Sequence, residues 1–423
     1  MTLSEKKAPM PIGYILQTYP GLTTTFIYRE VLSLKSCGFE ITTFSIWKPT
    51  ASKLSPESQP LMDATCYIFP ISWLRFIQRH IYFLLIHPVK YLGTALFVLT
   101  RPGESWKNRL RTVYHFGEAV YIAREVQQRN IQHLHAHFTI NAASIALIVA
   151  RLLDISFSFT AHNIFFTDRL LLNEKVRESR FIAVISEFSR EYLLRLVPGE
   201  SWRQKTHIIH CGISPSQFSP PDPQPANSVP LIFFVSQLQE RKGAPYLIEA
   251  CRLLKGRGVS FQCILAGDGP QEPIIKRLIE QYGLKDTIDL PGAIFNEQVR
   301  EYLNQADIFV LPCIVAQNGD MDGIPVALME AMACEIAVVS THVSGIPELI
   351  QDGESGLLVP EKDANALADA LQRLIEDKEL RLQLGKNGRQ KVMSEFDVDV
   401  SAAQLARLFE SCLLPGDRPN GSS

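Results

Sequence analysis

Residues 320–333 combine residue types and a spacing that suit binding of a phosphorylated or sugar-like ligand. The stretch reads DMDGIPVALMEAMA, and Glu330 follows Asp322 by eight positions. A loop ending in Gly-Ile-Pro predicts a helix that starts near Pro325, because proline is favoured in the first helical turn. The free N–H groups and the positive dipole end of such a helix suit a phosphate.

The two acids of this stretch could act on a ligand or on the fold. Asp322 lies just before the predicted helix, and Glu330 lies inside it. Carboxylate oxygens accept hydrogen bonds from the hydroxyl groups of a sugar or a ribose. Taken alone, each acid also fits an ordinary helix, as a capping Asp or a surface Glu.

Basic and histidine side chains near predicted strands are further candidates. Lys242 follows a strand as a cation that suits a diphosphate, or it is a solvated member of the charged run 240–242. His162 at a strand end could touch a ligand or be a structural histidine. His135 and His137 point to one face of a strand, and without a third ligand in view structural roles are favoured over a metal site.

The composition is that of a globular protein with two domains. The chain has 423 residues, 46% hydrophobic and 20% charged, and its net charge of −2 gives no case for nucleic-acid binding. The eight cysteines are scattered without a C-x-x-C pair, which favours a reducing compartment over a zinc site or a disulfide framework. The apolar run at 12–16 is too short for a signal peptide, so we expect a cytoplasmic protein.

Strand-like and helix-like segments alternate in both halves of the chain. This alternation predicts two α/β domains, each a doubly wound parallel sheet, with a ligand in the cleft between them. The expected strands are 12–16, 41–46, 131–135, 157–161, 181–185, 206–210, 231–235, 261–266, 308–311 and 337–340. The expected helices are 26–35, 142–153, 187–196, 244–255, 271–282, 326–333 and 364–376. The expected domains are 1–214 and 231–396, with a proline-rich linker at 215–230, a helix at 397–414 that could cross back to the first domain, and a disordered tail at 415–423.

Residues 71–130 interrupt the alternation with a basic, apolar insert. The segment carries nine Lys or Arg against three Asp or Glu. The stretch 81–100 approaches transmembrane length, but Pro88 and Lys90 interrupt it, and a central lysine costs about 2.5–3.5 kcal/mol on insertion scales. The insert is therefore a helical surface that lies on a membrane, or an all-protein helical hairpin packed on the first domain. Aromatic residues interleave with its charges: Trp73, Phe76, Phe83 and Phe97.

Taken together, these blocks resemble family 4 of the retaining glycosyltransferases, which have the GT-B fold of two Rossmann-like domains. The family signature has two Glu separated by seven residues, with Gly-hydrophobic-Pro after the first, and Asp322 and Glu330 keep that spacing. The segments VSQLQERKG, LAGDGP, SGIPELI and GESGLLV follow the family's order at 235–243, 265–270, 344–350 and 353–359. In the first half, LHAHF, FTAHNIF and VISEFSREY look like the branch that builds exopolysaccharides such as colanic acid.

The resemblance implies a site for a nucleotide diphosphate sugar, with no metal and no further cofactor. Glu330 would hold the ribose hydroxyls, Asp322 would stand near the donor sugar, and Lys242 would pair with the diphosphate. His162 would contact the sugar near its reacting carbon, and Gly21 would let backbone N–H groups approach the diphosphate. The implied catalytic residues are His162, Asp322 and Lys242, and the implied donor-binding residues are Gly21, Gln237, Arg241, Lys242, Gly267, Gly269, Gly323, Ile324, Pro325 and Glu330.

The sequence departs from the family pattern at two positions. The Arg of the family's Val-Gly-Arg turn is Gln237 here, which cannot neutralise a phosphate, and Arg241 is the nearest cation that could substitute. Asp322 replaces the first Glu and is one methylene shorter, which puts its reach to the sugar in question.

Three other interpretations compete. Asp320 and Asp322 spell D-x-D, the metal-binding motif of the other glycosyltransferase fold, although they lie late in the chain. Gln237 is compatible with a non-catalytic partner that binds a nucleotide sugar without turnover. A soluble enzyme acting on a small metabolite is the third, and the basic apolar insert argues against it.

The expected function is retaining, metal-independent sugar transfer from a nucleotide diphosphate sugar to a saccharide acceptor that could be lipid-linked. The acceptor hydroxyl would attack from the side of the leaving diphosphate, which the helix N-terminus and Lys242 would stabilise. We expect a cytoplasmic protein that could be peripheral at the inner face of the cell membrane.

Overall fold

The chain forms two compact units in the computed structural model, which describes residues 10–21, 25–50, 59–101, 104–162, 167–214, 217–221 and 227–413. Unit 1 runs to Ile185, resumes over Arg190–Ile209 and takes in the chain from Ala402. Unit 2 consists of Ser186–Ser189 and His210–Ser401. The expected boundary at residue 214 thus lies a few residues after the observed division, and the expected tail 415–423 lies outside the described residues.

Unit 1 contains a seven-stranded parallel sheet in the order β3-β2-β1-β4-β5-β6-β7. Consecutive strands step outward from β1 to β3 and then restart on the other side of β1 with β4. The carboxyl ends of β1 and β4 therefore flank a topological switch point, the position where such sheets bind ligands. The strands are β1 (Met10–Thr18), β2 (Phe39–Trp47), β3 (Cys66–Phe69), β4 (His133–His137), β5 (Ser156–Ala161), β6 (Ile182–Val184) and β7 (Thr206–Ile208).

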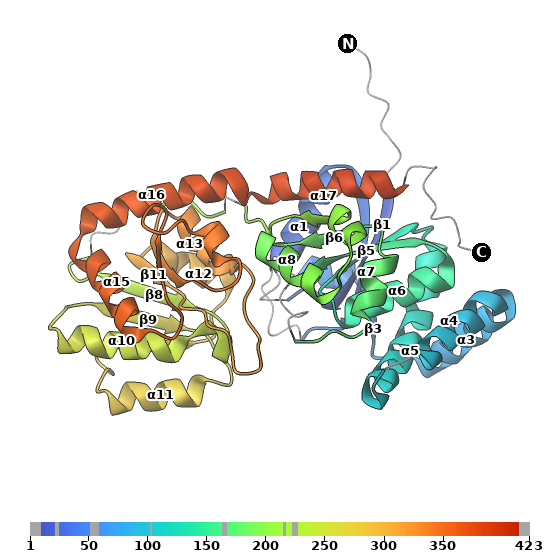
Figure 1. Cartoon of the computed structure of the whole chain (residues 1–423), viewed down its shortest axis with the longest axis horizontal. Coiled ribbons are helices and arrows are strands. Elements are labelled where there is room, and N and C mark those ends of the chain that lie inside the picture. The colour runs from blue at the N-terminus through green and yellow to red at the C-terminus, as the bar shows by residue number, and fades with distance from the viewer. Residues whose placement is uncertain are drawn as a thin grey trace, which may run out of the picture. The chain divides into compact units, whose positions relative to one another are not determined.

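The helices of this half of the chain include three that fill the unusual basic segment. Helices α3 and α4 lie side by side and both contact α5 (Figure 1). The helices are α1 (Thr25–Ser36), α2 (Gln59–Asp63), α3 (Trp73–Ile86), α4 (Pro88–Thr100), α5 (Trp106–Gln128), α6 (Asn141–Leu153), α7 (Leu172–Glu178), α8 (Glu187–Leu196) and α9 (Glu200–Gln204), and the last helix of the chain, α17 (Val398–Leu413), lies mostly in unit 1.

Unit 2 repeats the same topology with six parallel strands in the order β10-β9-β8-β11-β12-β13. Its switch point lies between β8 and β11. The strands are β8 (Leu231–Val235), β9 (Gln262–Ala266), β10 (Ile288–Gly292), β11 (Ile308–Val310), β12 (Ala337–Thr341) and β13 (Leu357–Val359). The helices are the short 3-10 helix η4 (Glu240–Lys242), α10 (Ala244–Gly256), α11 (Glu272–Gln281), α12 (Asn296–Leu303), α13 (Val326–Ala333), α14 (Ile346–Leu349), α15 (Ala364–Glu376) and α16 (Lys378–Glu395).

The prediction of two doubly wound parallel sheets is confirmed, and the strands missing from it share one feature. Strands β3, β10 and β13 were not expected, and each lies at the edge of its sheet. An edge strand pairs on one side only, so it tolerates residues that a central strand excludes, such as Pro291 in β10. Their sequences therefore lack the continuous apolar run that marks the central strands.

The expected linker at 215–230 is in part built into unit 2. Residues 215–216 and 222–226 lie outside the described residues. Between them, the side chain of Phe218 is buried, and its carbonyl accepts a hydrogen bond of 3.1 Å from Nη1 of Arg389. The described part of this segment therefore packs into unit 2, because burial of the Phe218 side chain is more favourable than its exposure to water.

Within the described residues, no single helix has both the length and the apolarity to cross a bilayer. Helices α3 and α4 meet these criteria only when they are taken together, and they are bent by 114° at the break between them.

The core of unit 1 places an aromatic residue of the last helix against the central strands. Phe409 in α17 is fully buried, and its ring centroid lies 5.2 Å from that of His135 and 6.3 Å from that of Tyr14. The C-terminal helix is therefore part of the hydrophobic core beneath β1 and β4.

Replacing Phe409 with Ala should lower the free energy of unfolding by about 3–5 kcal/mol, because the change empties a large core position that its neighbours cannot refill. Urea unfolding of the full chain measures this effect. Gln404→Ala, an exposed position of the same helix, is the matched control. Equal midpoints for the two variants would contradict a core role for α17.

Candidate functional site

Two cations and two carboxylates meet at the switch point of unit 2. Arg241 and Lys242 lie in η4, after β8, and Asp320 and Asp322 lie in the loop between β11 and α13. Nη1 of Arg241 is 2.6 Å from Oδ2 of Asp320, and its Nε is 3.2 Å from Oδ1 of Asp322. Nζ of Lys242 is 2.9 Å from Oδ2 of Asp322. The structure thus brings together three residues that the sequence nominated separately.

Asp322 is buried, so its charge depends on these partners. Burial alone would raise its pKa, but the charges of Lys242 and Arg241 hold the pKa below its ordinary value. Asp322 likewise raises the pKa of the Arg241 guanidinium against the opposing effect of burial. The Cys313 thiol donates to Oδ2 of Asp322 at 3.4 Å, and its own pKa is raised by burial and by that carboxylate. The shifted pKa values of Asp322, Arg241 and Cys313 therefore favour a charged carboxylate, a charged guanidinium and a protonated thiol at neutral pH.

This geometry argues against the interpretation of Asp320 and Asp322 as a metal-binding D-x-D motif. Both carboxylates face Arg241, a partner that competes with a cation for the same oxygens. The motif also lies in the second of two doubly wound sheets, whereas the other glycosyltransferase fold has a single Rossmann-like domain near the start of the chain. The two acids act as anchors for basic side chains.

The turn that carries these cations is possible only with glycine at its end. Gly243 has φ +69, and a Cβ there would lie 1.8 Å from the carbonyl oxygen of Pro312. The backbone N–H of Ile314 donates to the carbonyl of Arg241 at 2.9 Å. The loops after β8 and β11 therefore run in direct backbone contact, which fixes the spacing between Arg241 and the acids.

The Gly-Asp-Gly loop after β9 supports the same turn from its other side. Gly267 has φ +139, and a Cβ there would lie 1.8 Å from the carbonyl oxygen of Ser236. A Cβ at Gly269 would lie 2.8 Å from the carbonyl oxygen of Leu238. Both glycines thus have a packing reason for their identity, apart from any contact with a ligand. Gln237, between the two carbonyls, is exposed and accepts a hydrogen bond of 3.2 Å from the Gln239 amide.

The helix α13 has the expected bounds, with Pro325 just before its first turn instead of inside it. Pro325 is the N-cap residue, with φ −68 and ψ 126, and the helix starts at Val326. Asp322 does not cap this helix, because its oxygens are taken by Lys242, Arg241 and Cys313. Glu330 lies half-buried inside α13, while the loop residues Gly323, Ile324 and Pro325 are buried before it. The two acids of the signature therefore lie in different surroundings.

The predicted residues of unit 1 lie at the carboxyl edge of its sheet. Gly21 follows β1, although residues 22–24 of its loop lie outside the described residues. His162 follows β5, and its Nε2 lies 3.0 Å from Nδ1 of His137 at the end of β4. Nε2 of His137 lies 3.1 Å from Oε1 of Glu30 in α1. No sequence pattern marked Glu30, because it lies 107 residues from His137 along the chain.

Glu30, His135 and His137 place potential ligand atoms within 4.8 Å of one another, but other groups occupy them. The ring nitrogens of His135 lie 2.8 Å from the hydroxyl of Ser158 and 2.9 Å from that of Thr160. Those of His137 face His162 and Glu30. The contacts support the structural roles expected for His135 and His137.

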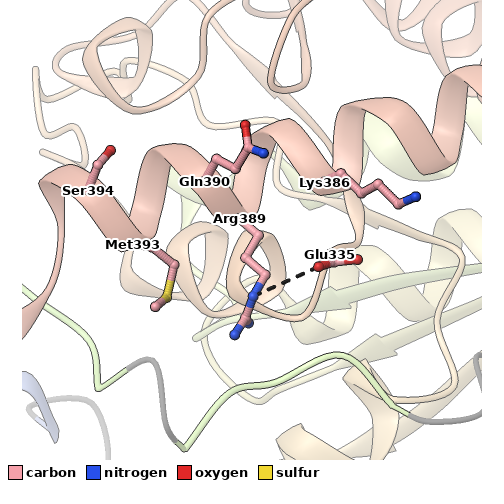
Figure 2. Close-up of a pocket in the computed structure, with 6 residues that line it drawn as sticks. All are labelled: Glu335, Lys386, Arg389, Gln390, Met393 and Ser394. Carbon is pink, nitrogen blue, oxygen red and sulfur yellow. Dashed lines mark ion pairs between the residues drawn. The ribbon is translucent and has the colours of Figure 1, made fainter.

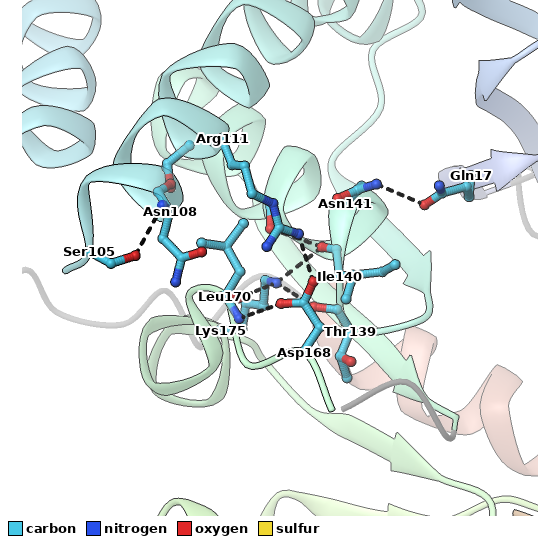
Figure 3. Close-up of polar contacts among 12 residues, drawn as sticks. Gln17, Ser105, Asn108, Arg111, Thr139, Ile140, Asn141, Asp168, Leu170 and Lys175 are labelled. Carbon is cyan, nitrogen blue, oxygen red and sulfur yellow. Dashed lines mark hydrogen bonds and ion pairs between the residues drawn. The ribbon is translucent and has the colours of Figure 1, made fainter. Parts of the chain in front are cut away.

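A buried lysine holds the loop after β4 in place. Lys175 in α7 is fully buried, and burial lowers the pKa of its ammonium to about 7. Its Nζ donates to three main-chain carbonyls, which match the three donors of an ammonium. Figure 3 shows Lys175 among these partners, which are Thr139, Ile140 and Leu170. The sequence did not single out this lysine, because only burial distinguishes it from a surface residue.

A hollow in unit 2 lies along α16, and none of the predicted site residues lines it. Its volume is about 560 Å³. Arg389 at its wall lies 3.8 Å from Oε1 of Glu335 and donates to the carbonyls of Phe218 and Ala333. The Arg389 guanidinium thus has a structural role within unit 2. The lining residues are Glu335, Lys386, Arg389, Gln390, Met393 and Ser394 (Figure 2).

Most of unit 2 matches a known protein family. The family "Glycosyl transferases group 1" matches residues 217–391, which include Lys242, Asp322 and Glu330. A putative colanic acid biosynthesis glycosyltransferase, WcaL of Escherichia coli (strain K12), is 44% identical over 211 residues, or 49% of this chain and 52% of that protein. The amylovoran biosynthesis glycosyltransferase AmsK of Erwinia amylovora is 41% identical over 207 residues, or 49% of this chain and 51% of that protein. The chain thus spans about half the length of the curated relatives it matches.

Solved structures identify the fold of the whole chain. The structure of Anabaena Alr3699/HepE in complex with UDP matches with a TM-score of 0.71 at 16% identity, over 95% of this chain and 100% of that one. A likeness at this identity establishes the architecture of two Rossmann-like units known as GT-B. Residues 217–391 of this chain therefore match the family "Glycosyl transferases group 1", within the two-unit architecture known as GT-B.

Proposed function

We propose that this protein transfers a sugar, with retention of configuration, from a nucleotide diphosphate sugar to a saccharide acceptor during the synthesis of an extracellular or cell-surface polysaccharide. The group 1 domain and the relatives named for colanic acid and amylovoran biosynthesis support this proposal. The observation that carries it is the cation pair of Arg241 and Lys242, which Asp320 and Asp322 fix at the switch point of unit 2.

The cation pair has donor capacity left for a diphosphate. Arg241 uses Nε and Nη1 on the two carboxylates, and its Nη2 has no partner among the described residues. The ammonium of Lys242 has one carboxylate partner, so two of its three donors remain. Guanidinium groups bind phosphate oxygens through charge-assisted hydrogen bonds. In this proposal, the fixed Arg241 therefore takes the role of the Arg that the family pattern has at the position of Gln237.

This arrangement suits stabilisation of a leaving group. As the bond between the sugar and the diphosphate breaks, negative charge grows on the departing oxygen. Donors that are already fixed lower the energy of that state without reorganising. In this proposal Lys242, Arg241 and the N-terminus of α13 share that charge, Glu330 holds the ribose, and no metal is required.

The direct test is an activity assay of the purified full chain with a panel of UDP-, GDP- and dTDP-linked sugars and a lipid extract as acceptor source. Transfer of label to a saccharide product is the expected result. Tight nucleotide-sugar binding without transfer or hydrolysis would favour the non-catalytic partner instead.

The surface of α3 and α4 supports a membrane-linked acceptor. Their outward faces are apolar, which inverts the pattern of a helix on a water-soluble surface. Val89 is 82% exposed, Leu85 71% and Trp73 70%. The other exposed apolar side chains of this hairpin are Leu74, Ile77, Ile81, Leu84, Ile86, Leu92, Leu96 and Leu99.

The occupant of this surface that its chemistry favours is an anionic bilayer. Basic side chains border the apolar face, including the exposed Arg75, Lys90 and Lys107. Tryptophan at the edge of such a face suits the headgroup layer, and Trp73 and Trp106 occupy the first positions of α3 and α5. A helix that lies in the interface buries its apolar face and leaves its cations among the lipid phosphates.

One aromatic residue expected on this surface belongs to the interior instead. Phe83 is fully buried, on the face of α3 that turns toward the protein. Phe76 and Phe97 are partly buried, and the Arg151 guanidinium lies 3.6 Å from the centre of the Phe97 ring. The membrane face therefore rests on aliphatic side chains and tryptophan, which the charge pattern alone could not separate from the inward residues.

We place the reaction at the inner face of the cell membrane. All eight cysteines are free thiols, which fits a reducing compartment. A surface that docks on anionic lipid brings the sheet edges close to a lipid-linked saccharide, whose apolar anchor stays in the bilayer.

Glu330→Ala should weaken the binding of the nucleotide by at least about 1 kcal/mol, because it removes a charged acceptor for the ribose hydroxyls. Isothermal titration with the nucleotide that the wild type binds best measures the loss. Glu379→Ala, at an exposed position of α16, is the control and should bind normally. Unchanged affinity for Glu330→Ala would remove the ribose assignment.

Arg241→Ala should reduce kcat/KM about 10²–10³-fold, the scale seen when one fixed donor to developing charge is lost. Gln237→Arg should change little or hinder, since the new cation would crowd Arg241. Arg252→Ala, an exposed cation of α10, is the control. Turnover that ignores Arg241→Ala but rises with Gln237→Arg would show that Arg241 does not compensate.

The wild type should float with phosphatidylglycerol vesicles at low salt and less at high salt, since each surface cation contributes about 1 kcal/mol through a screened interaction. The double variant Leu85→Glu with Val89→Glu should not float, whereas Gln78→Glu on the exposed polar strip of α3 should behave like wild type. A wild type that stays in solution at low salt would exclude the bilayer, and a dimer in light scattering would then identify a second copy as the occupant.

A further inference from the structure

Arg241 contacts its two carboxylates through different sides of the guanidinium group. Its Nε lies 3.2 Å from Oδ1 of Asp322, and its Nη1 lies 2.6 Å from Oδ2 of Asp320. A guanidinium group has two edges that can bind an oxyanion bidentately, one formed by Nε and Nη2 and the other by Nη1 and Nη2. Each carboxylate therefore occupies one nitrogen of one edge. Among the residues that the structure describes, this leaves only Nη2 for a phosphate, so a bidentate contact requires that one carboxylate withdraws.

The formal charges of this cluster also balance. Arg241 and Lys242 contribute the positive charges, and Asp320 and Asp322 contribute as many negative ones. A diphosphate is itself an anion, and it is attracted less by a neutral cluster than by cations whose carboxylate partners have moved away. Both the geometry and the charge therefore indicate that one of the two acids yields its cation to the ligand.

Asp322 is the acid that stays in place. Its side chain is only 10% exposed, and it accepts from the guanidinium of Arg241, the ammonium of Lys242 and the thiol of Cys313. Separating a buried carboxylate from its cations leaves an uncompensated charge in the interior, which is costly. Asp322 therefore keeps its contact with Nε of Arg241.

Asp320 is free to withdraw, because little besides Arg241 holds its side chain. The side chain is 23% exposed, so water can solvate the carboxylate once it leaves the guanidinium. Its main chain closes the local turn without the side chain: the N–H donates to Oδ1 of Asn318 at 2.9 Å, and the carbonyl accepts from the N–H of Ala316 at 2.9 Å. Losing the ion pair therefore leaves the bonds of this turn intact.

We propose that Asp320 and the diphosphate of the nucleotide compete for Nη1 of Arg241, so that Asp320 sets how tightly the site holds its nucleotide. This inference rests on the proposed function, in which Arg241 binds the diphosphate. When a phosphate takes the place of the Asp320 carboxylate, the edge of Nη1 and Nη2 binds it bidentately, while Asp322 keeps the guanidinium in position through Nε. As the nucleoside diphosphate leaves, Asp320 returns to Nη1, which favours release of the product.

Asp320→Asn tests competition, because a purely supporting role for Asp320 predicts the opposite result. Under competition, the variant should bind UDP, GDP or dTDP, whichever the wild type binds best, about fivefold more tightly, the scale of one partly exposed ion pair. Isothermal titration of the full chain measures the change, and a folding defect cannot produce a gain. Unchanged or weaker binding by the folded variant overturns the proposal. Asp320→Ser also lacks the charge and takes over the test should Asp320→Asn fail to fold.

Two further variants separate competition at Arg241 from general repulsion of the ligand. Asp289→Asn removes an exposed carboxylate of β10 and should bind like the wild type. In a double-mutant cycle, Asp320→Asn should give no gain when Arg241→Ala is also present. An equal gain with and without Arg241 would show that Asp320 acts only by repelling the anion, and would overturn the proposal.

Inorganic pyrophosphate separates this inference from the proposed function, since it offers a diphosphate without base or sugar. Asp320→Asn should bind it more tightly than the wild type does. Such a gain without binding of any nucleotide would support competition at Arg241 while the proposed function fails. Nucleotide binding that gains nothing in the variant would overturn competition and leave the proposed function standing. A wild type and a variant that bind neither probe would overturn both.

Discussion

The site of unit 2 depends on the ion pairs of the buried Asp322 carboxylate with Arg241 and Lys242. A carboxylate taken out of water needs partners that replace its hydration, and here two cations and a thiol do so. Because Lys242 and Arg241 come from the loop after β8 and Asp322 comes from the loop after β11, the ion pairs join the two strands that flank the switch point. Removing one partner would leave a buried charge uncompensated, which is the costly way to break such a cluster.

The glycines of this region follow from that constraint. To bring Arg241 to the acids, the turn after β8 must run against the backbone of Pro312, and only Gly243 has no Cβ to collide there. Gly267 and Gly269 let the backbone of the loop after β9 pack directly against the same turn. The site is therefore a stack of three loops in backbone contact, which fixes the spacing between its cations and its carboxylates.

Unit 1 places different side chains at its own switch point. Among the described residues, the carboxyl ends of β1 and β4 are lined by histidines, a tyrosine and the Glu30 carboxylate, and a buried lysine ties down the loop that follows β4. The two units thus offer different chemistry at equivalent positions of one topology. Ion pairs fix cations in unit 2, whereas hydrogen bonds between histidines, hydroxyl groups and Glu30 hold the side chains in unit 1.

The sequence by itself determined the architecture and most of the candidate residues. Continuous apolar runs identified the central strands, and the spacing of Asp322 and Glu330 with Gly-Ile-Pro located the candidate site of the second unit, because these features are local in the chain. The edge strands β3, β10 and β13 were not predicted, because a strand that pairs on one side only has a weaker apolar pattern in its sequence. The pairing of Arg241 with Asp320, the contact of His137 with Glu30 and the burial of Lys175 join residues that are far apart in the chain or depend on burial, so only the tertiary structure decided them. The same holds for the hairpin of α3 and α4: composition marked residues 71–130 as basic and apolar, but which side of each helix faces outward depends on packing, and this placed Phe83 inside and Leu85 outside.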